Sequence, residues 1–529
     1  MKLDSVLISD AVDPACAQLL RENGIQVTQK TKMPLEELLD EIKKHDGLIV
    51  RSDTQVTKQV MGNLKVIGMA GTGVDNIDLA AATKKGIIVM NTPGANSISA
   101  CELTCALILD LARHVSPANS ALKHGVWERQ SYTGTELYGK TLAVLGLGRI
   151  GRQVAKRMQA FGMKTISFDS MISSEAAREF YVEKMELEQI WPLADYITVH
   201  MPLIPQTKDL INFDVLNKCK KGICVVNVGR GGIVNEEGLL KSLESGQCGG
   251  AALDVFTEEP PRSEGLLRLL AHPKVLATPH LGANTTEAQK RVAVQIAGQF
   301  IALNKGSSLS GVVNCPALMT AMQANNKPWF DLAQALGSFG PSSLCTVTVQ
   351  TLGQGMERLT SDLCPAVLAG VLASGDVNMV NAPRRAREDK VKVKIRSEHL
   401  PGGLEQALVV SFSDGRRVQG SVIQGVPCIQ AVNDATFGPK GVELSGNLLM
   451  TEGATNLAKM VINKGGKIVR QATAQGGAGC VAVHTDGSIS GKHICSLQIV
   501  PLLSVSRFHR KIQSCSAEDC LENYKEILI

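Results

Sequence analysis

This sequence has few aromatic residues, no long apolar run and little excess of charge of either sign. Only 4% of the 529 residues are aromatic, and the formal net charge of +5 is not gathered in one run. Because a nucleic-acid binder usually carries a clustered basic surface, we expect no nucleic-acid partner. No apolar run is long enough to span a bilayer, and the opening MKLDSVLISD does not resemble a signal peptide. We therefore expect a cytoplasmic protein without a membrane partner.

Cysteines are present but lack the spacing of a metal site. The chain has 14, mostly inside apolar runs, and neither Cys101 with Cys105 nor Cys219 with Cys224 has partners at zinc spacing. They are typical of small buried hydrophobic residues, and free thiols suit a reducing compartment. We predict no metal site.

A glycine-rich loop at residues 141–169 organises the rest of the chain. The apolar run Thr141 to Leu145 predicts a buried parallel strand, and GLGRIG then opens an amphipathic helix to about residue 161. Gly146 allows the tight turn, Gly148 lets a pyrophosphate approach the backbone, and Gly151 lets the helix pack on the strand. The N–H groups and the dipole of the helix N-terminus would face the phosphates.

Asp169 supports the same interpretation. It ends the next apolar run, about 20 residues after the glycines, where a carboxylate accepts hydrogen bonds from the adenine ribose. It would also repel a 2′-phosphate, and Ser170, Met171 and Ile172 offer no arginine to bind one. A lone GxGxxG is weak evidence, but strand, glycines, helix and acid in register predict a NAD-binding Rossmann unit.

The first 93 residues alternate strands and helices, which predicts a small parallel sheet. Arg51 follows the apolar run 48–50, at the strand end where ligands of open α/β sheets collect, although a surface ion pair would explain it equally well. The turn after the strand near 66–69 contains Thr72, Gly73 and Val74, whose N–H groups could form a nest for a carboxylate. The alternation of strands and helices is then interrupted by a long apolar helix at 97–115 and a polar arm at 123–134 that contains Arg129.

Four further strands end in polar residues that one sheet edge would gather. In order these are His200, Arg230, Glu259 and His280. A hydride leaves a carbon only if the hydroxyl proton also leaves, so a base must lie beside the nicotinamide. His280 is the candidate base, with Glu259 to orient its ring and raise its pKa, and Arg230 would hold a substrate carboxylate. Taken singly, His280 could be a capping residue and Glu259 a turn residue, and we expect His200 in a cofactor loop.

These motifs resemble the D-isomer-specific 2-hydroxyacid dehydrogenase family. The residues that carry the resemblance are GLGRIG with Asp169, NVGRGG, DVFTEEPP and PHLGA, within the first 305 residues. It implies Arg230, Glu259 and His280 as the catalytic group, and Arg51, Gly73, Val74 and Arg129 as substrate-binding residues. The cofactor-binding residues expected on these motifs are Thr72, Gly146, Gly148, Arg149, Ile150, Gly151, Asp169, Met201, Val228, Gly229, Arg230, Asp254, His280, Gly282 and Ala283.

Within the family, VRSDTQVT, AGTGVDNIDL and WERQSYTGTEL look closest to the long, animal-like members that oxidise 3-phosphoglycerate to 3-phosphohydroxypyruvate, the first step of serine synthesis. The resemblance implies NAD as cofactor and a homo-oligomer, a dimer through the cofactor domain and then a tetramer. A hydroxypyruvate or glyoxylate reductase and a NAD-sensing binding protein remain as alternatives. Met69 stands where we expect a basic residue, which gives the reductase some support, and Asn235 replaces a frequent Asp.

The domain organisation follows from the same resemblance. We expect two doubly wound α/β domains, a substrate-binding domain at 1–95 plus 281–307 and a NAD-binding Rossmann domain at 96–280. An α+β intervening domain at 308–445 and an ACT-like regulatory domain at 446–529 would follow. In the tail we expect a linker through AMQANNKPW, a helix at 365–372, strands at 407–412 and 417–423, and a helix at 455–465. The basic cluster PRRAR (383–387) could contact a phosphate, but a solvated loop is the favoured interpretation.

Overall fold

The structure is a computed structural model that describes residues 1–341, 346–373, 375–398, 406–444, 447–452, 468–473, 475, 480–485 and 498–500. The chain divides into two compact units. One comprises Met1–Asn91 with Val294–Ile529, and the other is Thr92–Ala293. Helix α12 (Thr286–Lys305) begins in the second unit and ends in the first.

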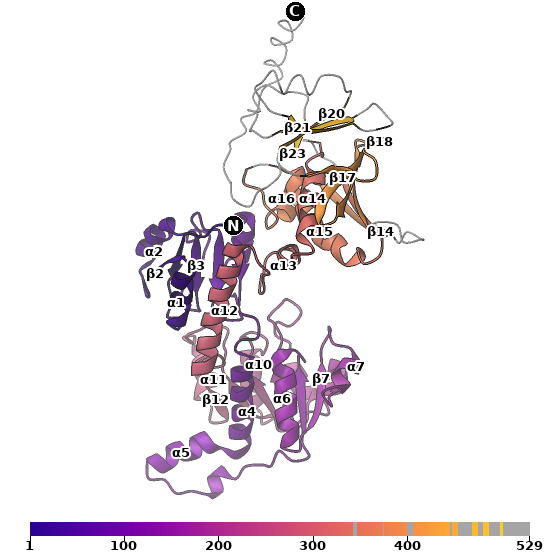
Figure 1. The fold of residues 1–529 in the computed structure, drawn as a ribbon. Coiled ribbons are helices and arrows are strands. Elements are labelled where there is room, and N and C mark those ends of the chain that lie inside the picture. The colour runs from indigo at the N-terminus through magenta and orange to yellow at the C-terminus, as the bar shows by residue number, and fades with distance from the viewer. Residues whose placement is uncertain are drawn as a thin grey trace, which may run out of the picture. The chain divides into compact units, whose positions relative to one another are not determined.

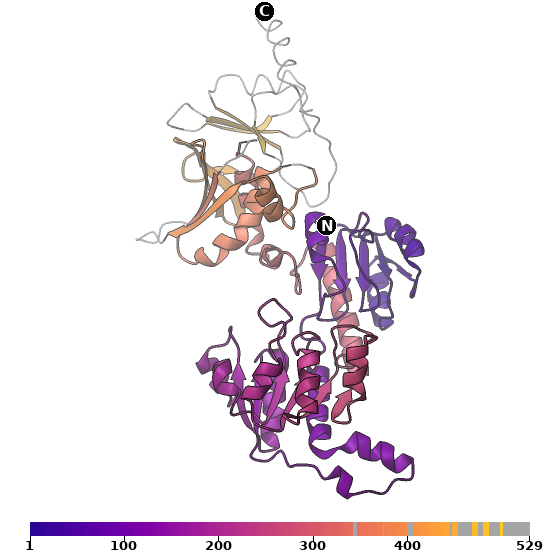
Figure 2. The same cartoon turned by 180° about the vertical axis from the view of Figure 1, so that it is seen from behind.

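The first unit begins with a five-stranded parallel sheet, as the βα alternation predicts. Its strands lie in the order β2 (Gln26–Gln29), β1 (Ser5–Ile8), β3 (Gly47–Val50), β4 (Val66–Met69) and β5 (Ile88–Met90). Its helices are α1 (Ala15–Glu22), α2 (Leu35–Glu41), η1 (Ile42–Lys44) and α3 (Leu79–Lys84), and α12 lies beside the sheet (Figures 1 and 2). A Cβ on Gly68 would lie 2.5 Å from the ring of Phe300, so glycine lets α12 pack closely on the strand.

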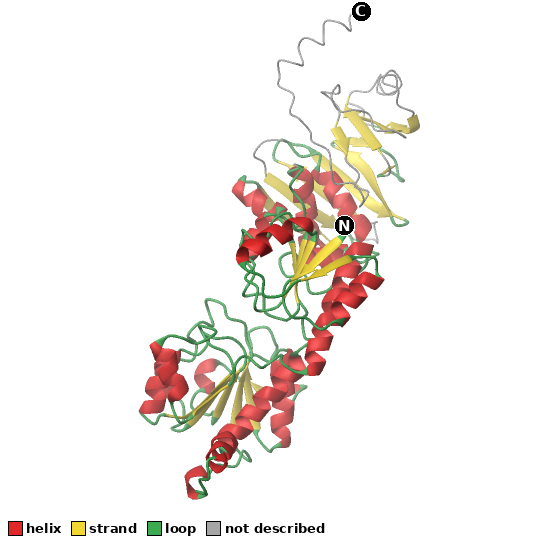
Figure 3. Ribbon diagram, turned by 90° about the vertical axis from the view of Figure 1, so that its left-hand side faces the viewer, coloured by secondary structure: helices red, strands yellow, loops and turns green. Residues whose placement is uncertain are grey.

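The second unit contains a seven-stranded parallel sheet with helices on both faces (Figure 3). The strands lie in the order β12 (Val275–Ala277), β11 (Cys248–Leu253), β10 (Ile223–Asn227), β9 (Tyr196–Val199), β6 (Thr141–Leu145), β7 (Lys164–Phe168) and β8 (Glu183–Lys184). The chain order reverses between β6 and β9, and a doubly wound sheet binds its ligand beyond the strand ends at such a point. The predicted Rossmann architecture is confirmed.

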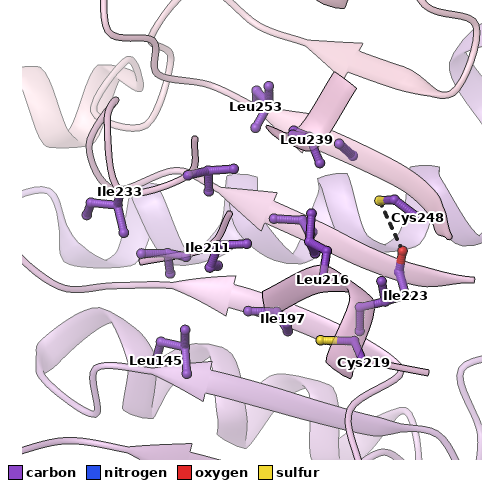
Figure 4. Close-up of a cluster of buried hydrophobic side chains, with 14 of the residues drawn as sticks. Leu145, Ile197, Ile211, Leu216, Cys219, Ile223, Ile233, Leu239, Cys248 and Leu253 are labelled. Carbon is purple, nitrogen blue, oxygen red and sulfur yellow. Dashed lines mark hydrogen bonds between the residues drawn. The ribbon is translucent and has the colours of Figure 1, made fainter. Parts of the chain in front are cut away.

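Helices and a buried apolar core complete this unit. The helices are α4 (Ser97–Arg113), α5 (Val115–Lys123), η2 (Gln130–Tyr132), α6 (Arg149–Ala160), α7 (Ser174–Arg178), α8 (Leu187–Ile190), α9 (Phe213–Lys218), α10 (Glu236–Glu244) and α11 (Glu264–Ala271). Figure 4 shows the core on one face, where Cys248 is fully buried and its thiol donates to the Ile223 carbonyl at 3.2 Å. Burial raises the pKa of this thiol to about 12, so Cys248 behaves as the small hydrophobic residue that the sequence predicts.

Helix α4 is the long apolar helix predicted at 97–115. We expected it to be buried between domains or against a second subunit, but one face packs on the sheet of its own unit. Cys101, Ile108 and Ala112 lie in that core together with Val226 and Ala252 of the strands. The surface of α4 that remains for contact with a second subunit is therefore smaller than the sequence indicates.

A mixed sheet follows in the first unit. Its path is β14 (Lys392–Glu398), β13 (Thr346–Leu352), β15 (Ala407–Phe412), β16 (Arg417–Ile423), β17 (Val426–Val432) and β18 (Ala435–Thr436), with β19 (Val442–Glu443) beside β17. The helices are α13 (Pro316–Ala321), α14 (Lys327–Gly337), α15 (Glu357–Val371) and α16 (Ala382–Glu388). The predicted strands at 407–412 and 417–423 are confirmed.

Three expectations in this region need correction. In AMQANNKPW, Ala321 ends α13 and Lys327 begins α14, so only a short turn at 322–326 connects the two helices. The helix predicted at 365–372 is present but begins earlier, since Pro365 lies inside α15. PRRAR forms helix α16, since its proline occupies the first turn, where a missing N–H costs nothing.

The last described strands form a four-stranded antiparallel sheet. Its order is β21 (Ile468–Thr473), β22 (Cys480–Thr485), β20 (Asn447–Glu452) and β23 (Gln498–Val500). The helix predicted at 455–465 lies outside the described residues.

Candidate active site

The glycine loop between β6 and α6 has the geometry that a dinucleotide requires. Gly146 has φ 95°, and a Cβ there would lie 2.4 Å from the His200 carbonyl oxygen. A Cβ on Gly151 would lie 2.0 Å from the Gly146 carbonyl oxygen, so this glycine is needed for the fold itself. A Cβ on Gly148 would meet no protein atom within 4 Å, and no side chain caps α6 at this residue. The loop therefore leaves space and backbone donors for a phosphate.

Asp169 closes this loop from the end of β7. Its Oδ2 accepts the Leu147 N–H at 2.8 Å, and its Oδ1 accepts the N–H groups of Met171 and Ile172 at 2.8 and 3.2 Å. The carboxylate thus fixes the glycine loop relative to the neighbouring strand. A carboxylate offers about four acceptor sites, so the ribose contact predicted for Asp169 is compatible with these bonds.

Glu259 and His280 form a hydrogen-bonded pair. The Nδ1 of His280 lies 2.7 Å from the Oε2 of Glu259, and the Oε1 of Glu259 accepts the Phe256 N–H at 3.0 Å. Both side chains are partly exposed, at 44% and 37%. The sequence predicts this pairing from two separate loops, and the structure brings them together.

Their environment shifts the pKa values of the two side chains in opposite directions. The hydrogen bond to Glu259 raises the pKa of His280, against the effects of burial and of the Arg230 charge. Burial works to raise the pKa of Glu259, but the hydrogen bonds from His280 and Phe256 outweigh it and the pKa falls. Glu259 is therefore ionised at neutral pH and favours the protonated form of His280.

Asp254 fixes the loop that carries His280. This buried carboxylate accepts the Thr278 hydroxyl and the Leu281 N–H, both at 2.6 Å, and the Gly282 N–H at 2.8 Å. Burial raises the pKa of Asp254 although these hydrogen bonds oppose it. His280 itself has φ 54°, a left-handed conformation that the surrounding bonds must hold. We predicted Asp254 as a cofactor contact, and the described hydrogen bonds of its carboxylate all go to this loop.

Arg230 lies on the loop that follows β10. The side chain of Asn227 accepts the Gly229 N–H at 3.0 Å and donates to the Arg230 carbonyl at 2.8 Å, which fixes the turn. A Cβ on Gly231 would lie 1.9 Å from the Phe256 carbonyl oxygen, so this loop packs directly on the loop that leads to Glu259. The guanidinium charge of Arg230 acts on both Glu259 and His280.

Other expected cofactor residues of this unit surround the same sheet edge. A Cβ on Gly282 would lie 3.2 Å from Val228 and 3.3 Å from Asp254. Met201 is the second residue after β9, and the Ala283 carbonyl accepts a hydrogen bond from the Gln289 side chain at 3.0 Å. The remaining ones, Arg149 and Ile150, form the first turn of α6.

The surroundings of His200 indicate a structural role. Its Nε2 lies 3.0 Å from the Thr198 hydroxyl, and desolvation lowers the pKa of His200 to about 3. The ring is therefore neutral over the physiological range. This agrees with our expectation of a loop position rather than a catalytic one.

Two residues that hold loops of the site in place have roles that the sequence analysis did not predict. The Glu236 carboxylate accepts the Thr257 N–H at 2.8 Å and its hydroxyl at 2.5 Å, which anchors the segment before Glu259. Asn235 caps α10 by accepting the Gly238 N–H at 2.7 Å, a role in which Asn and Asp are equally good. The contact between Glu236 and Thr257 joins residues far apart in sequence, so no motif reveals it, whereas an Asn directly before a helix is a local signal of a cap.

Arg51 lies at the end of β3 in the first unit, as predicted. The Arg51 N–H donates to Asp10 Oδ2 at 2.6 Å, and the Arg51 carbonyl accepts Asn76 Nδ2 at 2.7 Å. Burial lowers the pKa of Arg51, partly offset by Asp53 and Asp10, and the side chain stays cationic. Asp10 and Asn76 were missed in the sequence, and they fix the backbone from which Arg51 projects.

The neighbouring loop after β4 carries Thr72, Gly73 and Val74. The Thr72 carbonyl accepts the Asn91 side chain at 2.6 Å. No residue from 71 to 74 has a positive φ, so these amides do not form an alternating αR–αL nest. Met69, at the end of β4, is buried in the core of this sheet.

Arg129 lies on an exposed arm of the second unit. It precedes η2, and every residue from 122 to 131 is exposed. Arg129 is thus exposed in this chain, on the arm to which the sequence assigns it.

In the part of the chain that the structure describes, no group of three or more His, Cys, Asp or Glu residues could hold a metal ion. Among the same residues, none of the helices has the length and apolarity needed to cross a bilayer.

Two family models match the chain. Residues 105–282 match the D-isomer specific 2-hydroxyacid dehydrogenase, NAD binding domain, so the cofactor is NAD. Residues 325–428 match the D-3-phosphoglycerate dehydrogenase intervening domain.

Relatives and solved structures agree with these matches. Human D-3-phosphoglycerate dehydrogenase is 49% identical over 454 residues, which cover 83% of this chain and 85% of that protein. The Bacillus subtilis enzyme of the same name is 38% identical over 452 residues, 83% of each chain. The crystal structure of TT0316 protein from Thermus thermophilus is 32% identical with a TM-score of 0.54, covering 58% of this chain and 99% of that one. The chain therefore belongs to the D-3-phosphoglycerate dehydrogenases of the D-isomer-specific 2-hydroxyacid dehydrogenase family.

Proposed function

We propose that this chain oxidises 3-phosphoglycerate to 3-phosphohydroxypyruvate with NAD, the first step of serine synthesis. The observation that carries the proposal is the Glu259–His280 pair, with its 2.7 Å bond, in the unit that matches the NAD-binding domain. The likeness to D-3-phosphoglycerate dehydrogenases over 83% of the chain supports the substrate.

The residues present fit the cofactor. The open space at Gly148 and the uncapped start of α6 suit a pyrophosphate, and the carboxylate of Asp169 suits a ribose diol. When bound, NAD accepts a hydride from the substrate carbon. The protein groups must then bind the acid, orient its hydroxyl and remove the proton.

His280 is the proposed base. Its Nδ1 is engaged by Glu259, which leaves Nε2 as the nitrogen directed toward a substrate hydroxyl. Removal of the hydroxyl proton makes an imidazolium, and the adjacent carboxylate of Glu259 stabilises that charge. In the reductive direction the same imidazolium returns the proton.

Arginines are the proposed substrate anchors. Arg230 offers a planar fork for the carboxylate next to the reacting carbon, and its charge polarises a carbonyl in the reverse reaction. Arg51 would bind the phosphate, Gly73 and Val74 would contact the substrate beside it, and Arg129 would contribute from the arm. Asp10 and Asn76 hold Arg51 in place for that role.

A hydroxypyruvate or glyoxylate reductase is the alternative within the family. It needs no phosphate site, and Met69 in place of a basic residue would suit it. Met69 is buried among apolar side chains, so its identity is explained by packing. A NAD-sensing binding protein is disfavoured by the intact Arg230, Glu259 and His280.

The direct test is the absorbance of reduced nicotinamide with NAD and 3-phosphoglycerate at alkaline pH, beside unphosphorylated glycerate. We expect turnover of the phosphorylated acid only. Equal turnover of glycerate would favour the reductase, and turnover of neither with NAD bound would favour the binding protein.

We further propose a homodimer through the NAD-binding unit, and a tetramer built from it. Helix α5 has no buried residue, and the arm around it exposes Trp127 at 74% and Tyr138 at 80%. Val115 and Leu122 on α5 are also exposed. Large exposed apolar side chains gathered in one segment mark an interaction surface, and a second copy would cover them.

We propose a reducing compartment such as the cytoplasm. Eight of the cysteines that the structure describes are free thiols, and six of these eight are buried. Unpaired thiols are typical of proteins from reducing compartments.

A further inference from the structure

A basic cavity lies in the first unit, and none of its lining residues is among those assigned to the oxidation. It has a volume of about 340 Å³ and lies between the parallel sheet and the intervening part of the chain. Lys84 and Lys85, at the end of α3, line it from one side, and Arg384 and Arg385 of α16 from the other. Lys58 completes the lining cations. The volume is within the range of small-ligand sites.

Fixed contacts between the two sides define the walls. Arg384 Nη1 donates to the Ala80 carbonyl, in the first turn of α3, at 2.9 Å. Asn378 Nδ2 donates to the Gly86 carbonyl at 2.9 Å, and a Cβ on Gly86 would lie 2.5 Å from that nitrogen. The cavity is thus bounded by specific bonds rather than by loose surface contact.

Positive charge exceeds negative charge within it. Five cations line the cavity against two carboxylates, Asp376 and Glu388. Glu388 pairs with Arg384 at 3.0 Å, while Arg385 pairs with Asp389, and Lys85 donates to the Gly62 carbonyl. For the ammonium groups of Lys58 and Lys84, the described residues provide neither a hydrogen bond nor an ion pair within 4.0 Å. An anion would offset the remaining repulsion.

We propose that this cavity binds a small phosphate-bearing anion that bridges α3 and α16. Lysine ammonium groups and arginine forks are the side chains that bind phosphate oxygens. The hydrogen bond from Arg384 and the charges of Lys84 and Arg385 lower the pKa of Glu388, as an electropositive cavity requires. The ligand would join the intervening part of the chain to the sheet that carries Arg51.

The test is calorimetric titration of the full chain with inorganic phosphate, at constant ionic strength. Every protein in this comparison carries Arg51→Gln, which removes the proposed contact to the substrate phosphate. Phosphate binding at the cavity is therefore measured independently of the proposed function. We compare the double variant Lys84→Gln/Arg385→Gln with Arg387→Gln, which removes a positive charge from α16 outside the cavity. Arg384 is left intact because it holds the wall.

We expect saturable binding that the double variant weakens at least about 10-fold and Arg387→Gln leaves unchanged, as for loss of charge-assisted bonds. Glycerol 3-phosphate, titrated in parallel, distinguishes a phosphate ester from free phosphate as the tighter ligand. No saturable binding, or equal weakening by Arg387→Gln, would overturn the proposal. Unchanged thermal melting of the double variant confirms that it is folded.

Discussion

The Nδ1 of His280 and the Oε2 of Glu259 lie 2.7 Å apart, although 21 residues separate them in the chain. Asp254 holds the His280 loop and Glu236 holds the loop before Glu259. Hydrogen bonds from these two carboxylates to the loop backbones therefore position the pair. Its chemistry depends on residues outside the motifs that predict it.

His280→Ala should abolish most turnover while NAD still binds. A positioned general base contributes roughly 10²- to 10⁴-fold to a rate, and kcat should fall by that order. Steady-state kinetics and NAD titration by fluorescence measure the two effects. Near-normal kcat would remove His280 from the role of base.

Gly148→Val should weaken NAD binding at least about 10-fold and leave the melting temperature unchanged. Its Cβ would meet no protein atom within 4 Å, so only a ligand can be in its way. Gly151→Ala is the matched contrast, since its Cβ would lie 2.0 Å from a carbonyl oxygen. Overpacking of this kind costs roughly 1–3 kcal/mol, and that variant should melt earlier. Wild-type NAD affinity in Gly148→Val would contradict the proposed position of the pyrophosphate.

Arg51→Gln should raise KM for 3-phosphoglycerate about 10-fold or more. A hydrogen bond to a charged group is worth roughly 1.5–3 kcal/mol, and its loss appears in KM. The backbone bonds of Arg51 to Asp10 and Asn76 do not involve the side chain, so the fold should persist. An unchanged KM would exclude Arg51 from phosphate binding.

Trp127→Ser combined with Leu122→Ser should shift the oligomer toward monomer. Leu122 on α5 and Trp127 on the arm are both exposed, and a dimer would bury them. Light scattering after size-exclusion chromatography measures the mass. Tyr181→Ser, which removes an equally exposed aromatic ring elsewhere in the unit, should have no effect. If both proteins keep the same mass as wild type, the dimer does not use this arm.

Local pattern predicted the elements that short-range physics specifies. The strand 141–145, the helix that Gly148 opens and the strands 407–412 and 417–423 all follow from periodicity and glycine position. The basic run 383–387 was assigned to a loop because its charge obscured a proline-initiated helix.

Long-range supports could not be predicted in this way. Asp10, Asn76 and Glu236 act through bonds across 21 to 44 residues of sequence, and only the fold reveals them.

The most direct test of the account is the pH dependence of kcat/KM for oxidation in wild type and in Glu259→Gln. The base must be unprotonated, and Glu259 raises the pKa of His280, so wild-type activity should rise with an apparent pKa above the ordinary histidine value. The amide carries no charge to stabilise the imidazolium, so the variant's profile should move to lower pH, with a lower plateau. An identical apparent pKa in both proteins would contradict the assignment of His280 and Glu259 as the catalytic pair.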